Sequence, residues 1–371
     1  MEGTKPRTAS SIGMFDMLKG AGMLTIVFAH TAELYPMQAV SGLSLTAFFP
    51  FIYREALMAA FFIASGYGFR KRSIHKCIHQ QLKSLLKPYA YTALFTCVLH
   101  FIIHYKTFQY LPGTIGESIK VTGGFLLGLP HTAEYFGQEF FSCGPMWYLL
   151  ALMVGWVLLD VILNIFPERY VPWAVAGCVL LGWGASLVWE LPFCLIQGAV
   201  VVPYLYIGFL AKKKHLLDEP LPPKVFVGLL AATALIAVGA LATRTTDCIS
   251  LAEWSLGPLS IFLDGAAGLL FIRLFMRLSH GHGPIVHFLE AVGRRSLNIF
   301  CVHTVEIIAI PWYLMVAKFS AQPVLGMWLQ YAIALGSIWL VCELLRVRRA
   351  LIIRFFPAQR RTPAVHYTSR H

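Results

Sequence analysis

The sequence predicts an all-α membrane protein: a polytopic helical bundle of about ten transmembrane helices with both termini in the cytoplasm. Of its 371 residues, 57% are hydrophobic and only 13% are charged, about half the charged share of an ordinary soluble domain. Long apolar runs recur along almost the whole chain, as transmembrane helices require. These features exclude a disordered chain, a secreted disulfide scaffold and an ordinary cytosolic enzyme.

Ten apolar runs are long enough, or nearly so, to cross a bilayer. They cover residues 12–32, 47–69, 88–104, 146–166, 172–190, 196–211, 224–243, 255–276, 297–317 and 323–345. If the first run leaves the cytoplasm, most of the 30 Lys and Arg residues fall in the cytoplasmic connections. This distribution follows the positive-inside rule and sets the orientation. The net charge of +12 therefore reflects topology and gives no reason to expect a nucleic-acid partner.

Two connecting segments have features of their own. The longest polar interruption, residues 105–145, is placed on the outer side and includes an apolar piece, Ile119–Pro130. That piece is too short to span and is expected to be re-entrant or interfacial. The tail from Arg346 alternates arginines with Leu, Ile and Phe, as a helix lying on anionic membrane lipid would.

The first span carries four ionisable residues: Asp16, Lys19, His30 and Glu33. An ionisable group inside a span costs about 2.5–3.5 kcal/mol on insertion scales, so each one requires a partner or a function. Asp16 and Lys19 are three residues apart and can pair. Lys19 and His30 are separated by almost three helical turns, so they share a face roughly 16 Å apart along the axis. A basic group near the cytoplasmic end and an imidazole near the outer end suit an anionic carrier with chemistry at the far end.

Carboxylates and an arginine surround His30 in the predicted topology. Glu33 is one turn further out, and Arg54 and Glu55 fall in the outer part of the second span. A carboxylate beside a histidine fixes its tautomer and raises its basicity, which suits a general base. The alternative interpretation is that His30 only hydrogen-bonds a neighbouring helix.

The second span ends in a segment rich in glycine and arginine, residues 61–72. Glycines on either side of Tyr67 allow backbone to approach a ligand or another helix closely. Ser65 precedes them, and Arg70, Lys71 and Arg72 follow at the cytoplasmic mouth. Arginines there can bind phosphates through two hydrogen bonds each. The alternative is a simple positive-inside anchor.

The ninth span contains a histidine and a carboxylate, His303 and Glu306, three residues apart. This spacing lets them meet on one helix face. They are either a satisfied buried pair or part of the lining of a cavity that faces His30. The eight cysteines have no paired CxxC spacing, and we expect no metal site.

These segments resemble the integral-membrane acyltransferases of acyltransferase family 3. The family signature of a basic residue, ten residues and a histidine appears as Lys19 to His30, with lysine where the family more often has arginine. The Asp-x-x-Lys-Gly variant looks like the fucose O-acetylase-like branch. Trp147 begins a segment similar to the family's Trp-Phe-Leu helix start. The four similar segments occur in the family's order: FDMLKGAGMLTIVFAH, FFIASGYGFRKR, GPMWYLLAL and GRRSLNIFCVH.

The resemblance implies an acyl-CoA-dependent O-acyltransferase in the plasma membrane, the inner membrane of a bacterium. Such a protein takes an acyl group, usually acetyl, from cytoplasmic acyl-CoA and places it on a hydroxyl of an extracytoplasmic glycan or glycolipid. Residues 1–345 would form the transmembrane acyltransferase domain and 346–371 a basic cytoplasmic tail. The residues expected at the site are His30 and Glu33 for catalysis; Lys19, Ser65, Tyr67, Arg70 and Arg72 for acetyl-CoA; and Arg54, Trp147, His303 and Glu306 for the acceptor.

Two other functions are compatible with buried charges in a helical bundle. A flippase or permease for a glycan or lipid precursor would use the charged seam as a translocation path, without acyl transfer. A non-catalytic membrane subunit would use the charges only to hold helices together. Such a subunit would tolerate replacement of His30.

Overall fold

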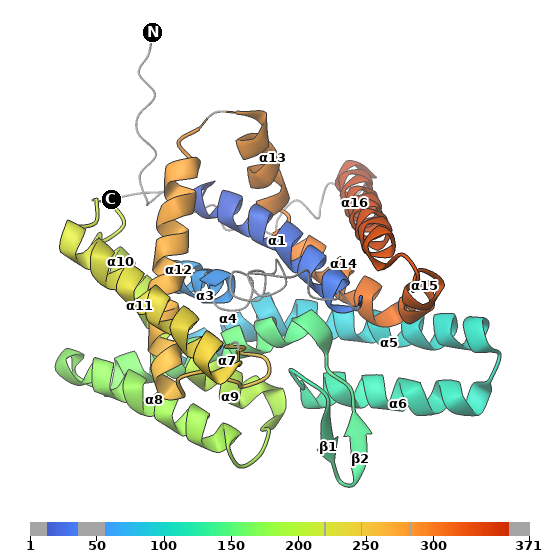
Figure 1. Ribbon diagram of the computed structural model, residues 1–371, viewed down its shortest axis with the longest axis horizontal. Coiled ribbons are helices and arrows are strands. Elements are labelled where there is room, and N and C mark those ends of the chain that lie inside the picture. Colours follow the sequence, from blue (N-terminus) through green and yellow to red (C-terminus); the bar gives the residue numbers. More distant parts are fainter. Residues whose placement is uncertain (1–12, 36–55, 219, 246, 282, 356–371) are drawn as a thin grey trace.

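The computed structural model describes residues 13–35, 56–218, 220–245, 247–281 and 283–355, and these are mostly helical (Figure 1). The exception is a short antiparallel hairpin of β1 (Ala133–Tyr135) and β2 (Gln138–Phe140). The helices are α1 (Gly13–Glu33), α3 (Met58–Tyr67), α4 (Ile74–Gln81), α5 (Lys87–Phe108), α6 (Leu111–Leu127), α7 (Trp147–Ile165), α8 (Val171–Ser186), α9 (Leu195–Val200), α10 (Val202–Lys213), α11 (Pro223–Thr243), α12 (Pro258–Leu278), α13 (Pro284–Gly293), α14 (Ser296–Ala309), α15 (Tyr313–Lys318) and α16 (Pro323–Phe355).

Several helices are long and apolar enough to cross a membrane, which makes this an all-α membrane protein. Within the described ranges there are five such segments: Ile74–Phe108, Gly144–Ile165, Pro223–Thr243, Pro258–Leu278 and Pro323–Arg348. A sixth is formed by Pro192–Val200 and Val202–Lys213, if this pair, bent by 50°, counts as one span. The predicted total of about ten spans and the cytoplasmic position of the termini stay predictions.

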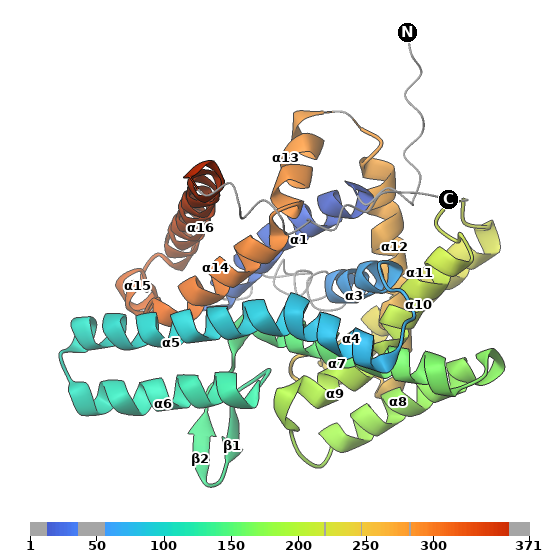
Figure 2. The same ribbon diagram turned by 180° about the vertical axis from the view of Figure 1, so that it is seen from behind.

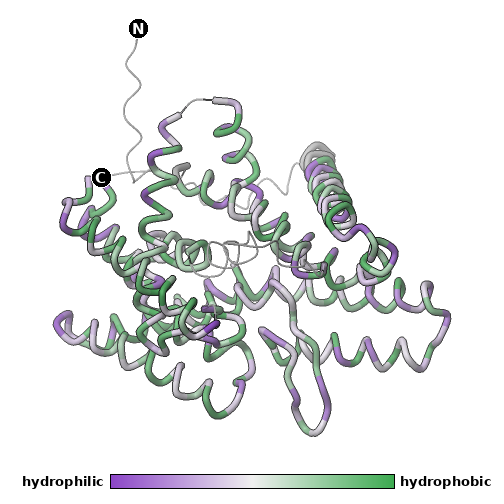
Figure 3. Tube along the Cα trace, viewed as in Figure 1, coloured by the Kyte–Doolittle hydropathy of each residue, from purple (hydrophilic) through white to green (hydrophobic). Residues whose placement is uncertain are grey.

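The hydropathy of the helices matches a membrane environment (Figure 3). Hydrophobic residues recur along most of the helices, and hydrophilic ones gather at helix ends and turns, such as the turn between α5 and α6. Large apolar side chains also cover much of the outer surface, among them Trp173, Leu181 and Leu241, each at least 76% exposed. A water-soluble protein rarely exposes apolar surface on this scale.

Helix α3 lies in the interior, between α10 and α12. Its residues Met58 to Ile63 are all buried. A Cβ added at Gly66 would overlap the backbone of Leu205, and one at Gly208 would overlap the backbone of Ile63. The glycine before Tyr67 therefore serves close packing of α3 on α10, as in other membrane helix pairs with small residues at the contact.

A long helical hairpin extends from the bundle (Figure 2). Its first arm continues from α4 through a π-helical turn, Leu82–Leu86, into α5. The connection between the second and third predicted spans, residues 70–87, is therefore largely helical. Its second arm is α6, which includes most of the predicted apolar piece Ile119–Pro130. Proline in the first turn starts α6, and Gly128 ends it at a φ of 62°, a conformation that glycine adopts at low cost.

Helix α1 packs most extensively on α13 and also contacts α12, α14 and α16. The short helix α13 falls between the eighth and ninth predicted spans, in residues 277–296, which the predicted topology places in the cytoplasm. Helix α16 continues without a break past residue 345, where the sequence predicts the end of the transmembrane domain. The bundle therefore holds α1 on several sides, while one stripe of α1 faces a cavity.

Candidate functional site

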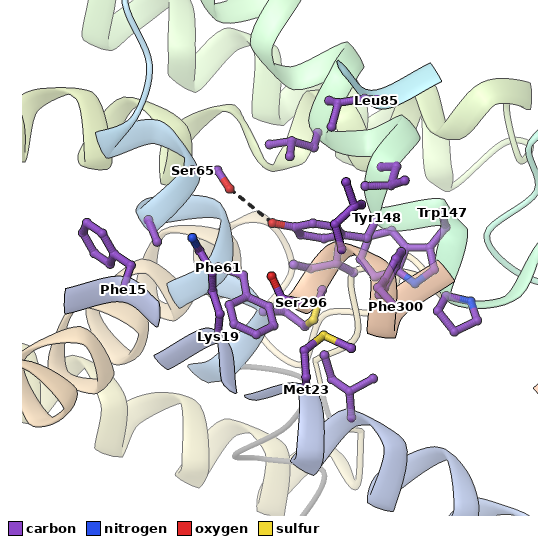
Figure 4. A pocket seen from close by; sticks show the side chains of 18 of the residues that line it. Phe15, Lys19, Met23, Phe61, Ser65, Leu85, Trp147, Tyr148, Ser296 and Phe300 are labelled. Carbon is purple, nitrogen blue, oxygen red and sulfur yellow. Dashed lines mark hydrogen bonds between the residues drawn. The ribbon is translucent and has the colours of Figure 1, made fainter. Parts of the chain in front are cut away.

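A cavity of about 790 Å³ lies between α1, α3, α7, α10 and α14. The close-up in Figure 4 shows side chains from α1, α3, α7 and α14 converging on it, including Lys19, Ser65, Tyr148 and Phe300. The turn formed by residues Cys248 to Leu251, between α11 and α12, closes another part of its wall. Most of the lining is apolar, so the few charged and polar groups define what the cavity can bind.

One face of α1 contributes to the cavity along most of the helix. Its lining residues recur every three or four positions, which is the period of a single helix face. The first and last of them are separated by about 27 Å along the axis at an α-helical rise. They are Phe15, Lys19, Met23, Ile26, His30 and Glu33. Lys19 and His30, expected on one face, thus line the same cavity.

Basic side chains gather at the Lys19 end of this cavity. Lys19 pairs with Asp16, with 3.6 Å between Nζ and Oδ1, as their spacing predicts. Arg70 and Lys212 line the cavity there and repel each other electrostatically. The Lys212 ammonium lies over the Tyr67 ring, 5.8 Å from its centroid, in a cation–π contact.

The segment after α3 is anchored by α7. The backbone N–H of Arg72 donates to Oδ1 of the buried Asp160 at 3.1 Å, and Nδ2 of Asn164 donates to the Arg72 carbonyl at 2.9 Å. The Arg72 side chain turns back and donates through Nε to the Arg70 carbonyl at 3.1 Å. Arg70 lines the cavity, whereas Arg72 is not among its lining residues.

We expect Asp160→Ala to weaken binding of an anionic ligand at Arg70, although Asp160 does not line the cavity. Loss of a charged hydrogen-bond acceptor costs about 1.5–3 kcal/mol of local stability and releases the segment that carries Arg70. The affinity for pyrophosphate, used as a simple anionic probe, should fall about 10-fold with the fold intact. Asp160→Asn, which keeps an acceptor oxygen, should restore most of that affinity. A pyrophosphate affinity that stays at the wild-type value in Asp160→Ala would show that the anchor is dispensable.

A histidine–carboxylate pair marks the other end of the cavity. His30 Nδ1 is 3.6 Å from Glu33 Oε2, and both residues line the cavity. Behind His30 lies a second pair on α14: His303 Nδ1 is 2.9 Å from Glu306 Oε2. The His30 and His303 ring centroids are 5.6 Å apart. The cavity lining does not include His303 or Glu306, which were expected at the acceptor site. Arg54, also expected there, lies outside the described residues.

The middle of the cavity contains a polar contact in an aromatic setting. Ser65 Oγ and Tyr148 Oη are 3.2 Å apart, the contact drawn as a dashed line in Figure 4. Tyr148 packs against Phe62 and Phe300, with ring centroids 4.7 and 6.1 Å away. Trp147, predicted at the acceptor site, also lines the cavity beside it.

Sequence reasoning missed Tyr148, Lys212 and His215, all of which line the cavity. Tyr148 follows Trp147 inside a continuous apolar helix, where nothing in the sequence separates a cavity tyrosine from a packed one. Lys212 belongs to a run of three lysines that was explained by the positive-inside rule. His215 follows that run and pairs with Asp218, with Nδ1 and Oδ2 2.9 Å apart.

A polar cluster braces the turn that closes the cavity. His131 Nδ1 donates to the Ser250 carbonyl at 3.0 Å, and His131 Nε2 is 3.7 Å from Glu190 Oε2. Gln197 Nε2 is 3.4 Å from Glu190 Oε1. Burial raises the pKa of the Glu190 carboxyl, and the nearby His131 opposes that shift. The cluster thereby holds Ser250 at the cavity wall.

Comparison with known proteins gives one match. The acyltransferase family 3 model, described as an acyltransferase domain, matches residues 12–347. Neither the curated proteins nor the solved structures give a significant match. The matched range contains every described residue that lines the cavity.

Proposed function

Since the chain belongs to acyltransferase family 3, we propose that it is a membrane O-acyltransferase. It moves an acyl group, in the simplest case acetyl, from cytoplasmic acyl-CoA to a hydroxyl of an extracytoplasmic glycan or glycolipid. One observation carries the proposal. A single cavity has basic side chains at its Lys19 end and the His30–Glu33 pair at the other. A reaction between an anionic donor and a neutral hydroxyl needs this separation of charge. The proposed membrane is the plasma membrane, the inner membrane in a bacterium.

The donor phosphates fit the basic end. Arg70 offers a planar guanidinium that can form two parallel hydrogen bonds to one phosphate, while Lys19 and Lys212 add point charges. Phosphates of coenzyme A would relieve the repulsion between Arg70 and Lys212. Arg72, anchored beside Arg70, is proposed to reach the phosphates from outside the cavity. The Lys19 end would then face the cytoplasm, in agreement with the positive-inside orientation.

The pantetheine arm fits the space between the two ends. It is long, thin and mostly uncharged, and the cavity follows α1 for about 27 Å. Along that path the wall is largely apolar, with Ser65 and Tyr148 as hydrogen-bonding groups midway. The arm would present its thioester near His30.

At the His30 end, the imidazole is proposed to act as general base. It takes the proton of the acceptor hydroxyl, whose oxygen forms the new bond to the thioester carbonyl carbon as the C–S bond breaks. The imidazolium then returns that proton to the departing thiolate, so free coenzyme A leaves. Glu33, 3.6 Å from His30 Nδ1, stabilises the imidazolium and orients the ring. Trp147 and Arg54 are proposed to contact the acceptor.

The test is release of free coenzyme A by the purified protein in proteoliposomes. Acetyl-CoA is the donor, and the acceptors are methyl glycosides of glucose, galactose, fucose and N-acetylglucosamine. We expect thiol release and an acetylated glycoside by mass spectrometry, with at least one acceptor. Failure to bind or turn over any acyl-CoA would reject the proposal in favour of a permease.

We expect Arg70→Ala and Lys212→Ala each to raise the KM for acetyl-CoA about 10- to 100-fold, because a hydrogen bond to a charged group contributes about 1.5–3 kcal/mol. Their kcat should change little, since both residues are proposed to contact the donor phosphates and not the reacting atoms. The matched control is Lys224→Ala, which removes a basic residue on α11 that does not line the cavity. Acetyl-dephospho-CoA lacks one phosphate group of acetyl-CoA. If Arg70 or Lys212 binds that phosphate, the KM values of wild type and of the corresponding alanine variant should differ less with this donor. Unchanged KM in both variants would place the donor elsewhere.

A further inference from the structure

Two histidine–carboxylate pairs lie side by side where α1 meets α14. In each pair the carboxylate follows the histidine by three residues: His30 with Glu33 on α1, and His303 with Glu306 on α14. The two imidazole rings are 5.6 Å apart between centroids and tilted by 31°. At this separation, ring nitrogens that point toward each other come within hydrogen-bond reach.

The two pairs differ in exposure and geometry. The side chains of His30 and Glu33 are 22% and 44% exposed, and their closest approach is 3.6 Å. The side chains of His303 and Glu306 are 1% and 6% exposed and are joined at 2.9 Å. Because water screens a charge at Glu33 far more than one at Glu306, the buried carboxylate has the stronger electrostatic effect at a given distance.

The His303 ring has one nitrogen engaged and one without a partner. A hydrogen bond between Nδ1 and the Glu306 carboxylate places the ring proton on Nδ1, which leaves a lone pair on Nε2. That Nε2 is buried and has no hydrogen-bond partner within the part of the chain that the structure describes. A buried acceptor of this kind needs a donor to offset its desolvation.

We propose that His303, oriented by Glu306, is a positioning residue that accepts a hydrogen bond from the His30 imidazolium during acyl transfer. The inference rests on the proposed function, in which His30 takes the acceptor's proton. His30 takes the acceptor's proton on one ring nitrogen, and the N–H on its other ring nitrogen donates to the lone pair of His303 Nε2. As the imidazolium forms, that second N–H becomes a stronger donor and the hydrogen bond to His303 strengthens. The negative charge of Glu306, relayed through His303, stabilises the positive charge that appears on His30. The proton is held on His30 until the thiolate takes it.

This assignment differs from a role in binding the acceptor. His303 and Glu306 are buried behind His30 and are not part of the cavity lining. Their backbone is fixed independently of the reaction: the Glu306 carbonyl accepts a hydrogen bond from Trp312 Nε1 at 3.3 Å. A group that interacts more strongly with the imidazolium than with the neutral imidazole should affect kcat and leave donor binding unchanged.

The test compares His303→Asn, Glu306→Gln and wild type in the coenzyme A release assay with acetyl-CoA and the methyl glycosides. Asparagine can keep the hydrogen bond to Glu306 but has no group at the Nε2 position. We expect kcat per folded molecule to fall at least 10-fold in both variants, part of the roughly 10²–10⁴-fold that a positioned general base contributes. The KM for acetyl-CoA should stay within about 2-fold of wild type, because neither substitution changes the contacts that bind the donor before reaction.

The matched control is His104→Gln, which alters another histidine on a helix. His104 Nδ1 is 3.1 Å from Thr114 Oγ1, and His104 does not line the cavity. Its kcat should match wild type. Wild-type kcat in His303→Asn would overturn the inference. Asparagine keeps the hydrogen bond to Glu306 but lacks Nε2, so such a result would show that His303 has only a structural role. A raised KM with unchanged kcat would also overturn it and favour acceptor or donor binding. A wild-type protein that turns over no acyl-CoA would reject the proposed function itself.

Discussion

His30→Ala should slow acyl transfer at least about 100-fold while leaving the protein folded and able to bind acetyl-CoA. Removing a general base costs about 10²–10⁴-fold in rate. The His30 imidazole lines the cavity at its far end and adjoins a carboxylate there, 3.6 Å from Glu33. Because His30 is 11 residues from Lys19 at the basic end of the cavity, the affinity of the variant for acetyl-CoA should be close to that of wild type. The measurement is coenzyme A release together with direct binding of acetyl-CoA to the purified variant.

The control for this variant is a second histidine in a comparable setting. His100 on α5 is 9% exposed, and its Nδ1 is 3.4 Å from Ser118 Oγ, yet it does not line the cavity. His100→Ala should retain wild-type turnover. Turnover that survives in His30→Ala would keep an acyltransferase but remove His30 from its chemistry. Equal losses in both variants would point to a general effect of removing intramembrane histidines.

The helix that carries the site could be predicted well from the sequence. Four ionisable residues within one apolar run are too costly to be accidental, and helical periodicity alone places Lys19 and His30 on one face. In the structure both line one cavity, and Asp16 pairs with Lys19. The family prediction is confirmed by the match over residues 12–347, but that match does not test the fucose O-acetylase-like branch.

Contacts between distant segments could not be predicted in the same way. Tyr148 meets Ser65 across 83 positions of sequence, and no local pattern encodes that distance. The sequence suggested no role for Asp160 because its partner is the backbone N–H of Arg72. A backbone N–H does not depend on the residue type, so the sequence does not reveal this contact. Hydropathy also underestimates helix where a segment is short or polar: α4 and α13 fall in connections predicted from their charge.

Gly293→Leu should prevent the formation of a stable, active protein. A Cβ at Gly293 would overlap the carbonyl of Asp16, and one at Gly20 would overlap the carbonyl of Leu289. The obstructing atoms are backbone, so no side-chain rotation relieves the clash, and α1 and α13 must separate. Overpacking of this kind costs about 1–3 kcal/mol when a core can adjust, and more when backbone is displaced. Because α1 carries Lys19 and His30, the shift would also open the cavity.

The matched control is Gly177→Ala on α8, where an added Cβ would have no atom within 4 Å. Alanine is the better helix former by about 1 kcal/mol, so this variant should be as stable as wild type or more so. The measurement is the monodisperse fraction in size-exclusion chromatography together with the thermal unfolding midpoint, first for Gly293→Ala and then for Gly293→Leu. We expect a graded loss, because the larger side chain drives the helices further apart. Wild-type stability in both Gly293 variants would mean that α1 and α13 are not in close contact. The position of α1, and with it the lining of the cavity, would then be wrong.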